Sequence, residues 1–112
     1  MSKLTASLLI IAFFSTKTQA QTITVSGVVE DTVNQKGIQN AVVALLSVKD
    51  SVLYKFARTD AEGKYSIGNL KAGDYILMTT HPYFADVIFK SAITGSETVI
   101  PKIALTSKSK LL

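Results

Sequence analysis

The residue types that most often carry out chemistry are scarce in this chain. His81 is the only histidine, and there is no cysteine. A zinc site would therefore need several carboxylates beside His81, and the sequence gathers no such cluster there. A serine–histidine–aspartate triad can be composed from His81, Asp86 and many serines, but the strained Gly-x-Ser-x-Gly turn is absent. We therefore expect His81 to be a polar residue at a strand end, and we predict no catalytic residue.

Asp60 and Glu62 resemble the start of a calcium-binding loop. Such a loop needs ligands at five or more positions, and this stretch offers only two carboxylates. The simpler interpretation is a turn in which Asp60 accepts hydrogen bonds from backbone N–H groups two residues on. The sequence thus predicts no metal site and no cofactor.

We interpret the stretch from residue 59 to 65, Thr-Asp-Ala-Glu-Gly-Lys-Tyr, as a tight turn that closes a β-hairpin. Gly63 can adopt a positive φ at the turn, which costs most other residues energy. Gly73 stands in the same place before Tyr75 as Gly63 does before Tyr65. The two Gly-x-Tyr units are spaced like successive strands of a small antiparallel β-protein. We predict structural turns at Asp60, Gly63 and Gly73.

Strand-like stretches follow one another along the chain, separated by turn formers. The apolar run at residues 42–48 is typical of a central strand covered on both faces. Residues 52–59 should place Tyr54, Phe56 and Arg58 on one face, and Pro101 should confine residues 98–105 to an edge strand or a bulge. The expected strands are residues 22–29, 42–48, 52–59, 64–67, 75–80, 83–89 and 98–105, and the expected core includes Val43, Leu45, Tyr65, Tyr75 and Leu77. Between them, residues 30–37, 68–73 and 91–96 should be loops. We predict an all-β, seven-stranded antiparallel Greek-key β-sandwich.

The N-terminal segment has the pattern of a secretion signal. Lys3 provides the charged start, residues 4–14 are mostly apolar, and Ala20 is the small residue expected before a cleavage site. A buried N-terminal helix is the alternative. We therefore expect a signal peptide at residues 1–20, the folded domain at 21–106 and a linker or truncated, loosely held tail at 107–112.

Charge argues against nucleic acid as a partner. The chain has 12 basic and 8 acidic residues, but Lys3, Lys17, Lys108 and Lys110 lie near its ends, so residues 21–106 are neutral. No excess of positive charge is left for binding phosphates. Without cysteine, an exported domain must rely on its core, which is more typical of a bacterial periplasmic or surface protein.

Four motifs occur in an order that is familiar. They are Val-Ser-Gly-Val-Val-Glu-Asp at residues 25–31, Gly-Ile-Gln-Asn-Ala-Val-Val-Ala-Leu at 37–45, the turn at 59–65, and Leu-Lys-Ala-Gly-Asp-Tyr-Ile-Leu at 70–77. Together they resemble the carboxypeptidase regulatory-like domain, a transthyretin-like (prealbumin-like) sandwich, over residues 22–105. His81-Pro82-Tyr83 replaces the Gly-Tyr that members of that family often carry.

The resemblance implies a non-catalytic domain. In Bacteroidetes-type bacteria such domains precede the plug and barrel of TonB-dependent outer-membrane receptors and related outer-membrane β-barrel proteins. We therefore expect a fragment of such a receptor, located in the periplasm or at the outer membrane, with a plug, a barrel or another protein as its partner. The alternative is a stand-alone secreted module that binds a glycan or a protein. After signal cleavage, we expect no segment of this chain to span a membrane.

Overall fold

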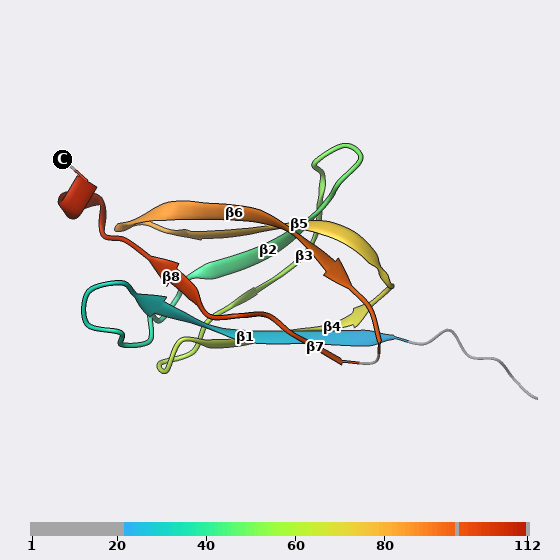
Figure 1. The fold of residues 1–112 in the computed structure, drawn as a ribbon, viewed down its shortest axis with the longest axis horizontal. Coiled ribbons are helices and arrows are strands. Elements are labelled where there is room, and N and C mark those ends of the chain that lie inside the picture. Colours follow the sequence, from blue (N-terminus) through green and yellow to red (C-terminus); the bar gives the residue numbers. More distant parts are fainter. Residues whose placement is uncertain (1–21, 96, 112) are drawn as a thin grey trace, which may run out of the picture.

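The computed structural model describes residues 22–95 and 97–111. The predicted signal at residues 1–20 lies outside the described part of the chain. The strands are β1 (Ile23–Asp31), β2 (Val42–Ser47), β3 (Leu53–Arg58), β4 (Lys64–Leu70), β5 (Gly73–His81), β6 (Phe84–Ile93), β7 (Glu97–Val99) and β8 (Ile103–Leu105), followed by a short 3-10 helix, η2 (Lys108–Leu111). Figure 1 shows their arrangement.

The strands form two sheets that enclose one core. One sheet has the order β4-β1-β7, with β8 also paired to β1, and the other has the order β3-β2-β5-β6. Alternate residues of each strand point into the space between the sheets, as in β1, where Ile23, Val25 and Val29 are buried. The predicted all-β sandwich is thus confirmed.

The last predicted strand is wrong in two respects. Residues 98–105 do not form one strand, because the chain around Pro101 leaves the ladder and separates β7 from β8. Both short strands pair with β1 in parallel, Val25 with Thr98 and Val29 with Ile103, so the sheet is not purely antiparallel. The missing N–H of Pro101 explains the break.

Several strands are longer than the sequence predicts. β1 continues through Asp31, β4 continues to Leu70, and β6 continues to Ile93, so parts of the predicted loops at 30–37, 68–73 and 91–96 are strand. The tail is also more structured than expected. Lys108 N–H donates to the carbonyl of Tyr83 at 3.0 Å, and residues 108–111 form η2.

A register shift in β3 changes which side chains share a face. Leu45 pairs with Lys55 and Leu46 pairs with Leu53, which leaves Tyr54 as an extra residue. Tyr54 stacks on Tyr75, with ring centroids 5.6 Å apart, instead of lying beside Phe56 as the simple alternation predicts. Because of this bulge, Leu53 and Phe56 lie on the same side of the sheet.

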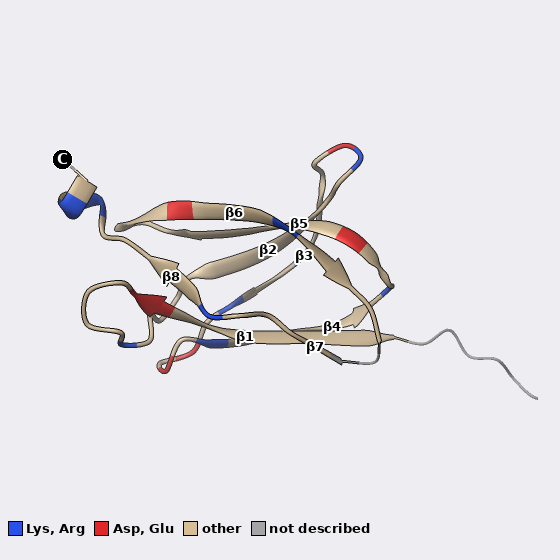
Figure 2. Cartoon of the chain, viewed as in Figure 1, with Lys and Arg blue, Asp and Glu red and all other residues tan. Residues whose placement is uncertain are grey.

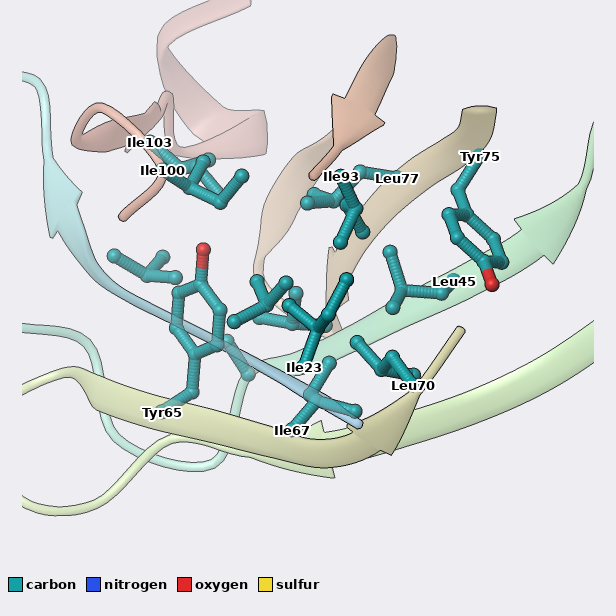
Figure 3. Packing of buried hydrophobic residues seen from close by; sticks show 14 of the residues in the cluster. Ile23, Leu45, Tyr65, Ile67, Leu70, Tyr75, Leu77, Ile93, Ile100 and Ile103 are labelled. Atoms are coloured by element: carbon teal, nitrogen blue, oxygen red, sulfur yellow. The ribbon is translucent and has the colours of Figure 1, made fainter. Parts of the chain in front are cut away.

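The core lies between the sheets and is entirely aliphatic and aromatic apart from two threonines. The residues predicted for it are all buried: Val43, Leu45, Tyr65, Tyr75 and Leu77. Figure 3 shows Tyr65 and Tyr75 at opposite ends of the cluster, and the hydroxyl of Tyr65 points toward Ile100 and Ile103. The two tyrosines that follow Gly63 and Gly73 thus close the two ends of the core.

Candidate functional site

His81 lies at the end of β5, where it takes part in the turn to β6. Its Nδ1 accepts a hydrogen bond from the N–H of Tyr83 at 3.1 Å. Its ring meets the ring of Phe84 edge-on, with centroids 5.1 Å apart. These contacts fix the two-residue turn at Pro82 and Tyr83. They give the imidazole of His81 a structural role in this turn.

The Asp60 carboxylate is used by the turn in which it lies. One oxygen, Oδ1, accepts from the N–H groups of Glu62 and Lys64, each at 2.9 Å. The hydrogen bond from the Lys64 N–H is the main reason that the pKa of Asp60 is below its ordinary value. Within residues 22–95 and 97–111, no three His, Cys, Asp or Glu side chains are grouped closely enough to hold a metal ion. Asp60 and Glu62 therefore form a capped turn.

The most distinctive surface is the outer face of the β3-β2-β5-β6 sheet, the side turned away from the core. In β2, Val43 and Leu45 point into the core, whereas Val42, Ala44 and Leu46 point outward. The continuous apolar run of β2 predicted cover on both faces. On the outer face Ala44 is buried at 4% exposure, whereas Val42 and Leu46 are half-buried, so among the described residues this face is covered only in part.

This outer face forms an apolar groove of about 350 Å³. Its lining residues come from three strands and are Val42, Ala44, Leu46, Leu53, Phe56, Arg58 and Met78. Ala44 is paired with Phe56 on one side and Met78 on the other, so the small side chain lies between two large ones. Phe56 and Leu53 keep 53% and 52% of their surfaces exposed, so the groove presents apolar area to solvent.

A second, more polar cleft of about 630 Å³ continues the groove toward the β5–β6 turn. Both hollows share Val42 and Arg58. The cleft adds His81 and Tyr83, and Tyr83 is 72% exposed. Together the two hollows form what we call the outer-face site: an apolar centre with a cationic and aromatic end.

Sequence reasoning placed Phe56 and Arg58 on one face of their strand, but it did not assemble this site. The missing step was the bulge at Tyr54, which brings Leu53 onto the face of Phe56. One signal was present in the sequence. A strand that is apolar at every position from Val42 to Leu46 needs cover on two sides.

Comparison with known families identifies the fold and the family. The model of the carboxypeptidase regulatory-like domain matches residues 24–106. The chain belongs to the carboxypeptidase regulatory-like domain family. This confirms the resemblance carried by the four sequence motifs, and it makes the chain a member of a non-catalytic domain family. A comparison with curated protein sequences finds no match.

Solved structures share the fold of this regulatory-like domain at low sequence identity. A type II cohesin–X-dockerin complex from Acetivibrio cellulolyticus aligns with a TM-score of 0.61 and 19% identity over 76% of this chain and 58% of the other. BcpA, the major pilin subunit of Bacillus cereus, aligns with a TM-score of 0.59 and 13% identity over 79% of this chain and 31% of the other. 3-Chlorocatechol 1,2-dioxygenase from Rhodococcus opacus 1CP aligns with a TM-score of 0.60 and 10% identity over 80% of this chain and 60% of the other.

These likenesses concern the sandwich and not the activity, because identities this low are shared by proteins of unrelated function. The regulatory-like domain spans less than two thirds of each of these chains. Among its described residues there is no helix with the length and apolar character needed to cross a membrane. The domain is thus a β-sandwich of the carboxypeptidase regulatory-like family, with the outer-face site as an apolar hollow on one of its sheets.

Proposed function

We propose that this regulatory-like domain is a non-catalytic accessory domain of an outer-membrane TonB-dependent receptor-like protein, and that its outer-face site binds the plug or another protein of the receptor. The apolar outer face around β2, which is only partly covered, carries this proposal. Phe56 and Leu53, at 53% and 52% exposure, leave apolar area in contact with solvent that a protein partner would bury favourably.

Further support comes from the chain and its relatives. The pattern of residues 1–20 is that of an export signal, which would deliver the domain to the periplasm. The matched family covers the domain from residue 24 to 106, and proteins of similar fold include pilin subunits and a cohesin–dockerin complex. An exported, non-catalytic sandwich is thus supported, and the receptor is our proposal.

Site-specific photo-crosslinking in cells that express the native locus tests the proposal. A photoreactive residue in place of Phe56 should crosslink to an outer-membrane plug or barrel segment, identified by mass spectrometry. The same residue in place of Val99 is the matched control, because Val99 is 74% exposed on β7 in the other sheet. Equal crosslinking from both positions would contradict the assigned surface.

Cell fractionation tests the receptor itself. We expect the polypeptide that carries this domain to be recovered with the outer membrane. A freely diffusing periplasmic product that holds no barrel would refute the receptor and favour the alternative, a stand-alone secreted binding module.

The alternative rests on the polar end of the outer-face site. Tyr83 is 72% exposed beside Arg58 and His81, and an exposed aromatic ring with polar neighbours is suited to stack on a sugar. A Tyr83→Ala variant of such a module would lose binding to a glycan panel. Val33→Ala serves as a control at an exposed residue, 60%, that does not line the cleft.

A further inference from the structure

β6 is an edge strand that is only partly covered. It ends the sheet order β3-β2-β5-β6 and pairs with β5, and its first residue, Phe84, also forms an isolated bridge with Ser107. The tail of the chain occupies its first residues, since Ala85 N–H donates to the Thr106 carbonyl at 2.9 Å and Lys108 N–H donates to the Tyr83 carbonyl at 3.0 Å. Among the described residues, no strand pairs with the far side of β6 beyond this point (Figure 1).

The direction of the free backbone groups follows from the ladder. Ser47 N–H donates to Val52, on the β3 side, so the odd-numbered residues of β2 bond with β3 and the even-numbered ones bond with β5. Ala44 pairs with Met78, and Leu77 of β5 then bonds with Phe89. Carried across β6, the same alternation leaves the N–H and C=O groups of Ile88 and Lys90 facing the free edge. It does not extend to Asp86, because the β5–β6 register shifts between Thr79 and His81.

The side chains of these same three residues are exposed on the outer face. Ile88 is 60% exposed, between the acidic Asp86 and the basic Lys90. Figure 2 shows the two opposite charges as separate segments along β6. The edge thus presents the sequence acid, apolar, base at every second position, together with unpaired backbone groups.

We propose that a second copy of this chain pairs with β6, antiparallel, about a two-fold axis at Ile88. In this register Asp86 lies opposite the partner's Lys90, Ile88 lies opposite the partner's Ile88, and Lys90 lies opposite the partner's Asp86. A two-fold interface must be self-complementary, because the same surface of each copy meets itself. The pattern of acid, apolar residue and base along β6 meets this condition. The opposed Ile88 residues would exchange two backbone hydrogen bonds, and the opposite charges on one face stabilise the pairing. This inference goes beyond the proposed function and does not depend on it.

The charges also select the register. Moving the axis to Lys90 or to Asp86 would place like charges directly opposite each other, which destabilises a strand pair. Moving it to Phe89 would place Ile88 opposite Lys90. The tail at Thr106 limits the pairing to residues 86–90, because it already occupies the edge at Ala85.

The other exposed edge of this sheet lacks these properties. β3 carries two cations, Lys55 and Arg58, and no acidic residue. Lys55 also reaches across to β4, where its Nζ donates to the carbonyls of Gly68 and Asn69 at 3.0 and 3.1 Å. On the inner side of β6, by contrast, Val87 and Phe89 are only partly buried and would pack against the same residues of the second copy.

Sedimentation of the exported full chain over a range of concentrations tests the proposal through a charge-exchange series. The wild type should associate reversibly as a dimer. Asp86→Lys and Lys90→Asp should each weaken the dimer by about tenfold or more, because each places like charges opposite each other twice. The double exchange, Asp86→Lys with Lys90→Asp, should restore it, and an equimolar mixture of the two single variants should form heterodimers.

Two controls make the same changes of charge away from the edge. Glu62→Lys and Lys36→Asp alter exposed residues in loops and should leave association at the wild-type level. A wild type that stays monomeric at every concentration would overturn the proposal. Single exchanges that associate like the wild type would overturn it as well.

A cysteine at the axis gives an independent measurement, since the chain has no cysteine of its own. Directly opposed residues in a hydrogen-bonded pair have Cα atoms about 5.5 Å apart, within the range of a disulfide. Ile88→Cys should therefore form a disulfide-linked dimer on mild oxidation. Val52→Cys is the control, because Val52 is 57% exposed, close to the 60% of Ile88. Equal rates of crosslinking for both variants would argue against the two-fold pairing.

Discussion

Gly37 and Gly63 lie backbone against backbone, although they come from two separate loops. A Cβ atom on Gly63 would collide with the Val29 carbonyl and the Gly37 Cα, and one on Gly37 would collide with the Glu62 carbonyl. The close approach permits Val29 N–H to donate to the Gly63 carbonyl at 2.8 Å and Ile38 N–H to donate to the Val29 carbonyl at 2.9 Å. Both loops are thereby fixed to the middle of β1.

Gly63→Ala should destabilise the domain more than Gly95→Ala. Both glycines have a left-handed φ, 79° and 78°, so both substitutions introduce similar backbone strain. Only Gly63 has neighbours that a methyl group would meet. We expect a loss of about 1 kcal/mol in the free energy of unfolding at Gly95 and about 3 kcal/mol or more at Gly63, measured by chemical denaturation. Equal losses would mean that the close approach of the two loops contributes nothing.

Tyr65→Phe and Tyr75→Phe should have opposite consequences. The hydroxyl of Tyr65 is buried and has no hydrogen-bond partner among the described residues, whereas that of Tyr75 donates to the Lys71 carbonyl at 2.7 Å. Removing the first hydroxyl should leave the thermal midpoint unchanged or raise it. Removing the second should cost about 1 kcal/mol. A lower midpoint for Tyr65→Phe than for Tyr75→Phe would contradict this prediction.

Alkaline pH should destabilise the domain through Tyr65. Burial raises the pKa of its hydroxyl to about 12, whereas the unfolded chain ionises near the ordinary value of 10.0. The contribution is fully present below pH 10 and is lost as the pH rises toward 12, because only the unfolded state then gains from ionisation. It amounts to about 2–3 kcal/mol. Denaturation curves recorded between pH 10 and 12 give the free energy of unfolding at each pH. We expect this free energy to fall less steeply with pH for Tyr65→Phe than for the wild type.

Thr59→Val should be far more damaging than Thr79→Val. Thr59 is buried, its Oγ1 donates to the Ile38 carbonyl, and the same atom accepts from Ala41 N–H at 2.9 Å. Thr79 is fully buried too, but its Oγ1 has no partner among the described residues. We expect a cost of about 2–3 kcal/mol at Thr59 and about zero at Thr79. Thr59→Ser, which keeps the hydroxyl, should recover most of the loss, and similar midpoints for both valine variants would refute the assignment.

The sequence predicted local geometry well where one residue type decides it. Gly63 adopts the left-handed φ proposed for it, and Asp60 accepts from the N–H of Glu62 as expected. The alternation of residues in β4 and β5 correctly assigned Tyr65, Tyr75 and Leu77 to the core. These features depend on neighbours in the chain, so a pattern of nearby residues can reveal them.

The errors concern partners that are distant in the sequence. Nothing near Val99 indicates that β7 pairs in parallel with Thr24–Ser26, or that Val99 itself is 74% exposed. The bulge at Tyr54 accompanies its stacking on Tyr75, a residue of another strand. The outer-face site was missed for the same reason, because it combines side chains that only sheet register brings together.

The parallel pairing of β1 with β8 has a consequence for folding during synthesis. Val29 finds its partner, Ile103, only after nearly all of the domain has been made. Until then the backbone groups of Val29 that face β8 are unpaired, and its side chain is not fully buried. Pairings over such sequence distances form slowly, since loop closure must precede the contact. We therefore expect the domain to fold only once residue 105 is free to pair, and to remain unfolded while the chain is being made.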